Sequence, residues 1–173
     1  YNCIANLNIM LEYIDAANSN LFSERNKDVY KGEALGLRAF LHLDMLRLFS
    51  PASSALPDAP AVPYVTHYGK AVTGHLLQAM DLLKADPILD YVNLDFTERR
   101  GRKTYFNYWA AVATLARAYM YKGDKNNALK YANLFIEADS DPSKTNFGWT
   151  HFTAVETTYE YECDRIFSNE LIF

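Results

Sequence analysis

The sequence has no concentrated charge of either sign. Its 173 residues include 17 basic and 21 acidic side chains, for a formal net charge of -4. The nearest approach to a basic block is the segment ERRGRK, residues 98–103. Phosphate binding needs a more concentrated positive face than this segment offers. The composition therefore disfavours nucleic acid as a partner.

Long apolar runs are also missing. No run approaches the roughly 20 residues that cross a bilayer. The chain begins at Tyr1, without a charged and apolar leader ahead of a cleavage site. We interpret this start as a boundary within a longer protein, and we expect the natural chain to continue after the apolar end at Leu171–Phe173.

Cysteine is scarce, since only Cys3 and Cys163 are present. The two form neither a CxxC pair nor a metal-ligand spacing. Cysteine often serves as a small core residue, which favours two buried free thiols. One disulfide between them is the alternative.

Motifs for catalysis and metal binding are absent from the sequence. No histidine forms HExxH or has a second ligand at metal spacing; the four are His42, His67, His75 and His151. The GxSxG, GxGxxG and P-loop patterns are missing too. Asp139 and Asp141 share a turn, where aspartate normally satisfies backbone groups. We therefore predict no catalytic residue, no metal site and no cofactor.

What the chain does contain is apolar and aromatic. Half of its residues are hydrophobic and 14% are aromatic, which is enough for a sizeable core. The length predicts a single helical domain over residues 1–173.

Apolar residues recur every three or four positions, the spacing of amphipathic helices. In the first helix, which we expect to end near Asn18, the stripe is Ile4, Leu7, Leu11 and Ile14. A second helix is predicted between the cap Ser23 and Pro51. One of its stripes is Tyr30, Ala34, Leu37, Leu41, Met45 and Leu48, and the other is Leu35, Ala39, Leu43, Leu46 and Phe49. Gly36 lies between them, and we expect another backbone to approach it closely.

A third helix is predicted over residues 74–86, with Leu76, Leu77, Met80 and Leu83 facing inward. The next pair of helices turns at Gly123–Asp124 and resembles a tetratricopeptide repeat of about 34 residues. Its inward residues are Trp109, Val112, Leu115, Ala116 and Tyr119, then Ala128, Tyr131, Ala132, Phe135 and Ile136. We expect Tyr119 to fill the space towards a neighbouring hairpin. The alternation in YEYECD, residues 159–164, is compatible with a short strand near the C-terminus.

Two aromatic residues are candidates for ligand binding. Phe147 and Trp149 lie in a predicted loop with Gly148 between them. An indole can stack on the apolar C–H face of a sugar ring. The structural alternative is that Trp149 plugs the loop onto the core. For Trp109, which opens a helix, core packing is the favoured interpretation.

With these elements in order, the segment GEALGLRAFLHLDMLRLF resembles the SusD/RagB family of outer-membrane glycan-binding lipoproteins. The matching residues are Gly32, Glu33, Ala34, Leu37, Arg38, Ala39, Phe40, Arg47 and Phe49, followed by Val62, Pro63 and Tyr64. Upstream, Ile4, Asn6 and Leu11 resemble the preceding helix of the family. Downstream, the hairpin from Gly101 and Arg102 to Ala128, and the terminal NELIF, are similar to later family elements.

The resemblance implies a mainly all-α fold of tetratricopeptide-like helical hairpins with irregular loops. It implies a non-catalytic protein, anchored by lipid at the cell surface, that holds oligosaccharides for a TonB-dependent, SusC-like transporter of the outer membrane. Family members are considerably longer, so the chain is expected to be the N-terminal helical part of such a protein. The alternative is a tetratricopeptide scaffold that binds a peptide or protein partner.

Overall fold

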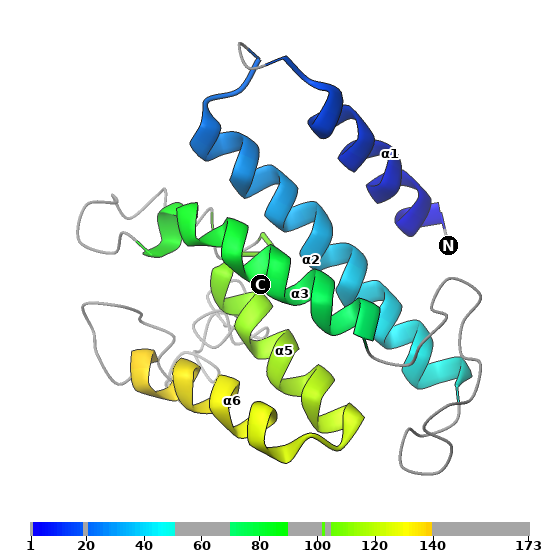
Figure 1. The fold of residues 1–173 in the computed structure, drawn as a ribbon, viewed down its shortest axis with the longest axis vertical. Coiled ribbons are helices and arrows are strands. Elements are labelled where there is room, and N and C mark those ends of the chain that lie inside the picture. Colours follow the sequence, from blue (N-terminus) through cyan, green and yellow to red (C-terminus); the bar gives the residue numbers. More distant parts are fainter. Residues whose placement is uncertain (1, 19–20, 51–69, 90–101, 103–104, 140–173) are drawn as a thin grey trace, which may run out of the picture.

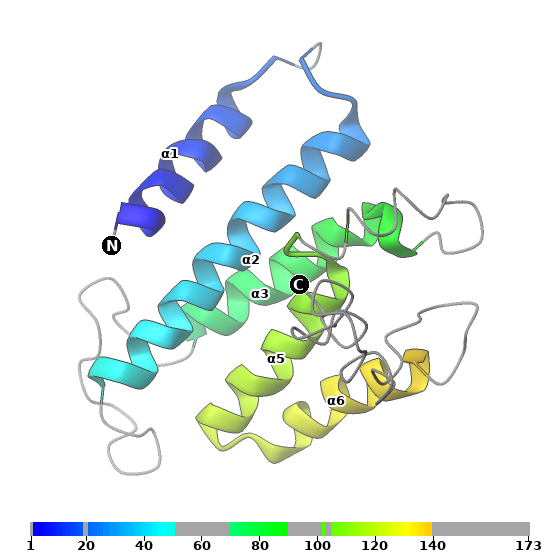
Figure 2. The ribbon, with the colours of Figure 1, turned by 180° about the vertical axis from the view of Figure 1, so that it is seen from behind.

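The computed structural model describes residues 2–18, 21–50, 70–89, 102 and 105–139. Within these ranges the chain forms five α-helices and two short 3-10 turns, and no strand. Figures 1 and 2 show the helices in a row, with α1 against α2, α2 against α3, α3 against α5, and α5 against α6. The predicted all-α class is confirmed. The predicted strand at residues 159–164 lies outside the described residues.

Helix α1 spans Asn2–Ala16 and packs one stripe against α2. Ile4, Leu11 and Ile14 are buried, as predicted, and Leu7 is partly buried. The prediction of a buried Cys3 is wrong, because Cys3, in the first turn of α1, is an exposed free thiol. Cys163 lies outside the described residues.

Helix α2 spans Glu24–Phe49 and has the predicted ends. Its first turn is capped by Ser23, whose hydroxyl oxygen accepts the Asn26 N–H at 3.3 Å. The backbone N–H of Ser50 donates to the Leu46 carbonyl at 3.0 Å, and the helix ends at Phe49, two residues before Pro51.

Most of one apolar stripe of α2 is core, whereas in the other stripe only Ala34 is buried. Leu35, Ala39, Leu43 and Leu46 are buried, whereas Leu37, Leu41 and Met45 are only partly buried. Tyr30, Leu48 and Phe49 are exposed, Phe49 by 71%. Figure 1 shows the last turn of α2 extending beyond α3 and α5, so these neighbours do not cover it.

Two glycines let α2 pack closely against its neighbours. A Cβ at Gly36 would overlap the ring of Phe106, and a Cβ at Gly32 would lie 2.7 Å from the Leu83 Cγ. The prediction that another backbone approaches Gly36 is therefore wrong, since a buried aromatic ring occupies that space. At Gly32 the Ala79 carbonyl oxygen does come near, at 3.3 Å from the added Cβ.

Helix α3 spans Lys70–Leu82, so it begins four residues before the predicted start. It continues into two 3-10 turns, Leu83–Ala85 and Pro87–Leu89, that meet at the predicted stop, Asp86–Pro87. Leu76 and Leu83 are fully buried, and Leu77 and Met80 are partly buried against the core.

The predicted hairpin is confirmed as α5, Tyr108–Lys122, and α6, Lys125–Asp139. Asn107 caps α5 by accepting the Ala110 N–H at 3.0 Å. Gly123 ends it in the left-handed conformation, with φ at 81°, which glycine adopts without strain. Ile136, predicted to face inward, is 59% exposed.

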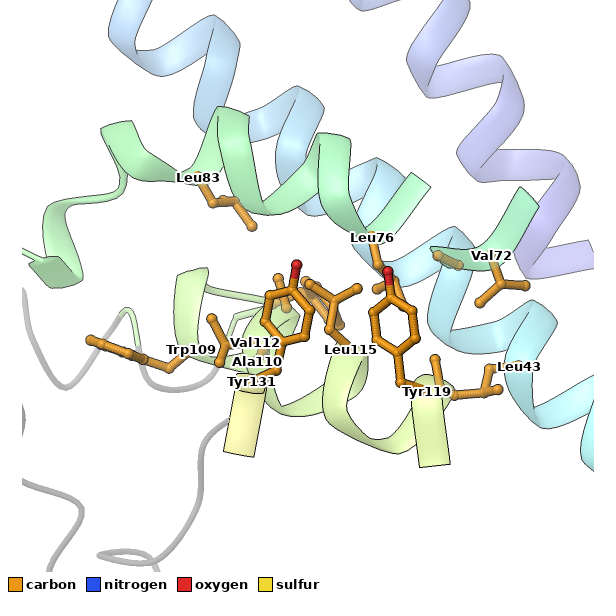
Figure 3. Packing of buried hydrophobic residues seen from close by; sticks show 14 of the residues in the cluster. Leu43, Val72, Leu76, Leu83, Trp109, Ala110, Val112, Leu115, Tyr119 and Tyr131 are labelled. Atoms are coloured by element: carbon orange, nitrogen blue, oxygen red, sulfur yellow. The ribbon is translucent and has the colours of Figure 1, made fainter. Parts of the chain in front are cut away.

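The main core lies between α2, α3 and the α5–α6 hairpin (Figure 3). Leu43, Val72 and Leu76 approach Leu115 from one side, and Tyr131 of α6 closes the other. Tyr119 stacks on Tyr131 with ring centroids 5.6 Å apart, so it fills space within its own hairpin instead of towards another. A smaller cluster of Leu11, Ala34, Leu35 and Ala79 attaches α1. No helix in the described ranges is long and apolar enough to span a membrane.

Candidate functional site

The two predicted ligand residues, Phe147 and Trp149, lie outside the described residues, so their role stays a prediction. Trp109 packs edge-on against Tyr108 and Phe135 at centroid distances of 5.0 and 5.9 Å, and it is buried. The prediction that Trp109 belongs to the core is confirmed.

A hollow of about 460 Å³ lies between the C-terminal halves of α2 and α5. Its lining residues are Leu43, Arg47, Ala116, Arg117, Met120 and Tyr121. The volume lies within the range of about 300–1,000 Å³ that is typical of small-ligand pockets.

Apolar atoms and two guanidinium groups line this hollow. The Arg117 guanidinium carbon lies 5.6 Å from the Phe40 ring centroid, a cation–π contact. Arg47 donates to Asp44 at 3.3 Å, and the Tyr121 hydroxyl donates to the Leu46 carbonyl at 3.3 Å. An apolar surface with guanidinium donors can hold a sugar ring through stacking and hydrogen bonds to hydroxyl or carboxylate oxygens. None of the described residues that line it is a carboxylate or imidazole that would act as a general acid or base.

A second hollow, of about 450 Å³, follows the end of α3 and is lined by Arg25, Lys84, Ala85, Asp86 and Leu89. The carboxylate among its described lining residues, Asp86, has a side chain with 0% exposure. Arg102 donates to Asp86 through Nε at 3.0 Å and through Nη2 at 2.6 Å, and the Ile88 N–H donates at 2.9 Å. Both carboxylate oxygens are therefore hydrogen-bonded. Asp86 has a structural role, because it holds Arg102 and the Ile88 backbone.

Arg102 also bonds Glu33 on α2, so one guanidinium joins α2 to the turn after α3. Burial opposes the charge on Arg102, but the hydrogen bonds and charges of Asp86 and Glu33 outweigh it and raise the pKa of Arg102. Burial raises the pKa of Glu33 against the opposing attraction of Arg102. Sequence reasoning missed this network, because nothing in the spacing of positions 33, 86 and 102 signals that they meet.

Within the described ranges, no three His, Cys, Asp or Glu side chains are grouped so as to hold a metal ion. His42 and Asp44, two residues apart on α2, make separate contacts: His42 Nδ1 lies 2.8 Å from the Arg38 carbonyl oxygen, and Asp44 pairs with Arg47.

Residues 1–120 match the sequence model of a SusD-like family that is described as starch-binding and associating with the outer membrane. The match covers more than half of the chain, and the chain therefore belongs to this family. No curated protein matches the chain. The matched residues include α1, α2 and α3 and end within α5, so α6 lies beyond the match.

Two solved structures from Bacteroides vulgatus ATCC 8482 share the fold. One, a candidate sugar-binding protein, is 25% identical with a TM-score of 0.62 over 79% of this chain. The other, a SusD-like carbohydrate-binding protein, is 26% identical with a TM-score of 0.55 over 80% of this chain. The chain spans 31% and 30% of the lengths of these proteins, so it corresponds to about a third of each.

Proposed function

We propose that this chain is the N-terminal helical part, residues 1–173, of a protein that binds an oligosaccharide at the outer membrane without cleaving it. The family match over residues 1–120 carries the proposal. The carbohydrate binding ascribed to the SusD-like structure from Bacteroides vulgatus supports the ligand class.

The described helices suit a scaffold role in such a protein. α2, α3 and α5 share one continuous core, and Arg102 fixes α2 to the turn after α3. A rigid core of this kind holds loops in place, and loops on a rigid scaffold commonly carry binding residues. The non-catalytic role agrees with Asp86, whose carboxylate oxygens are engaged by Arg102 and Ile88.

Trp149, with Phe147 beside it, is our first choice for the glycan contact. Its indole offers a wide apolar face and one N–H donor, which suits a pyranose ring. The hollow with Arg117 and Met120 is the second choice, because it combines an apolar surface with a guanidinium donor.

Calorimetry of the full-length protein with a panel of starch-type and other oligosaccharides tests the ligand class. We expect saturable binding of at least one glycan, weakened in Trp149→Ala with little change in the free energy of unfolding. Tyr13→Ala is the matched control, since Tyr13 is an aromatic residue that is 75% exposed on α1.

The outcome of these variants assigns the contact. Lost stability with intact binding would make Trp149 a packing residue, and loss of binding in Arg117→Gln would move the contact to the hollow. Absence of binding across the whole panel would contradict the proposed function.

The partner and location form the second part of the proposal. We propose a lipid-anchored protein at the cell surface that acts with a TonB-dependent, SusC-like transporter, and the family description of outer-membrane association supports this location. Affinity purification of the tagged protein from detergent-solubilised outer membranes is expected to recover such a transporter. Recovery of the protein in the soluble fraction alone would refute this part.

A further inference from the structure

Arg38 is a partly buried cation where α1, α2 and α3 meet. Its Nη1 donates to the Asn8 Oδ1 of α1 at 2.9 Å, and its Nη2 lies 3.5 Å from the His75 Nε2 of α3. The third donor, Nε–H, is buried without a hydrogen-bond partner. Asn8 offers a neutral oxygen and His75 a ring nitrogen, so neither bonded group is an anion.

Two other cations that join α2 to its neighbours are neutralised by carboxylates. Arg102 holds two carboxylates, and Lys31 pairs with Asp15 of α1 at 2.5 Å. Arg38 makes no ion pair in the part of the chain that the structure describes, and burial lowers its pKa. A charged side chain is rarely buried without a counter-charge. Burial removes its hydration, and no attraction to an opposite charge then compensates the lost hydration free energy.

Two histidines adjoin this guanidinium. His42 Nδ1 lies 2.8 Å from the Arg38 carbonyl oxygen and must carry the hydrogen, since a carbonyl only accepts. His75 Nε2 faces the guanidinium and therefore accepts, which places the hydrogen of the neutral ring on Nδ1. Burial is the main cause that lowers the pKa of His75, and the electrostatic effects of Arg38 and His42 lower it further. The cluster thus holds one fixed positive charge and two groups that can become positive.

We propose that Arg38, together with His42 and His75, forms a binding site for an oxyanion: a sulfate, a phosphate or the carboxylate of a sugar acid. A guanidinium pairs with such groups through two parallel N–H donors, and the charge-assisted bonds are stronger than bonds to neutral acceptors. Asn8 is exposed on α1, so its side chain can turn away when the anion takes its place. This proposal does not rest on the glycan contact proposed at Trp149.

An anion here favours protonated histidine, so binding strengthens as the pH falls. The charged groups that act on His75 are Arg38 and His42, both on α2, while α1 contributes the neutral amide of Asn8. An opposite charge within hydrogen-bonding distance raises a histidine pKa by about 1 or more.

Histidine-selective NMR of the full-length protein tests the site. The probes are inorganic sulfate, inorganic phosphate, glucuronate and, as the neutral control, glucose. We expect an oxyanion to raise the pKa of His75 by about 1, and glucose to leave it unchanged. A raised His75 pKa with sulfate or phosphate indicates a general oxyanion site. A raised His75 pKa with glucuronate alone indicates a sugar-acid site, and either result supports the proposal.

Calorimetry with the anion that raises the His75 pKa tests whether Arg38 binds this anion. Arg38→Gln is expected to lower the affinity at least about tenfold, in line with the loss of a charge-assisted bond. Arg25→Gln is the matched control, since Arg25 lies on the same helix, is exposed and donates to the Ala85 carbonyl at 3.0 Å. His75→Gln, which keeps a neutral polar side chain, removes the gain in affinity at low pH and decides the question if Arg38→Gln fails to fold. An unchanged His75 pKa with every anion, or equal affinity of wild type and Arg38→Gln, would overturn the proposal.

Discussion

Replacing Gly36 with alanine introduces one methyl group at the tightest contact of α2. The added Cβ would overlap two ring carbons of Phe106 and would lie 3.0 Å from a third, Cζ. Phe106 is only 1% exposed, so its ring has no free space into which to move. Either the ring leaves its rotamer or α2 moves away from the segment before α5.

Two opposing terms set the size of the effect. Overpacking a well-filled core costs about 1–3 kcal/mol, and the overlap with a buried ring places this site near about 3 kcal/mol. Alanine in place of glycine inside a helix gains about 1 kcal/mol. We therefore expect Gly36→Ala to lose about 2 kcal/mol of unfolding free energy.

Urea denaturation followed by circular dichroism measures this loss, and Gly74→Ala supplies the control. Gly74 lies inside α3, and an added Cβ there would meet nothing within 4 Å. Only the gain from replacing glycine with alanine inside a helix then applies. Gly74→Ala is therefore expected to stabilise the protein by about 0.5–1 kcal/mol.

The two glycine variants thus have opposite expected signs for one chemical change. If Gly36→Ala is as stable as wild type, the contact with Phe106 is not as tight as described. The double variant Gly36→Ala/Phe106→Leu makes room for the methyl group, and it is expected to lose less stability than the sum of its two single variants.

Three further predictions concern the core, the Arg102 network and His75. Leu43→Ala removes a buried side chain and is expected to cost about 2–5 kcal/mol, more than Leu41→Ala, which is only partly buried; equal midpoints in urea would contradict this ranking. Asp86→Ala leaves Arg102 short of a counter-charge and is expected to cost about 3 kcal/mol by the same assay, so a loss below that of an exposed ion pair would refute the network. The pKa of His75 is held below its ordinary value of 6.5 in the folded protein. The contribution of neutral His75 to the free energy of unfolding is therefore fully present above pH 6.5, and it is lost as the pH falls through the lowered pKa. His75→Gln is therefore expected to flatten the decline of stability as the pH falls below 6.5, and an unchanged decline would refute this assignment.

Local signals in the sequence predicted the helices well. The stripe of Ile4, Leu11 and Ile14, the cap Ser23 and the turn at Gly123 each act over a few residues, and each is confirmed. Family membership was predictable for a similar reason, because the motif around Gly32 and Arg38 is contiguous.

Features that depend on distant partners were not predictable. Which stripe of α2 is buried depends on the neighbours that cover it, and Leu41 and Leu43 differ only in that respect. The Arg102 network and the ring at Gly36 join residues about 70 positions apart, a relation that helical periodicity does not encode. The ligand residues Phe147 and Trp149 remain predictions.

Capture of an oligosaccharide without cleavage can be checked on the sugar itself. The full-length protein is incubated with an oligosaccharide that it binds and is then removed, and the chain length of the recovered sugar is measured by mass spectrometry. We expect saturable binding and recovery of the oligosaccharide at its original length. Shortened products that disappear when a single Asp or Glu is replaced would contradict it.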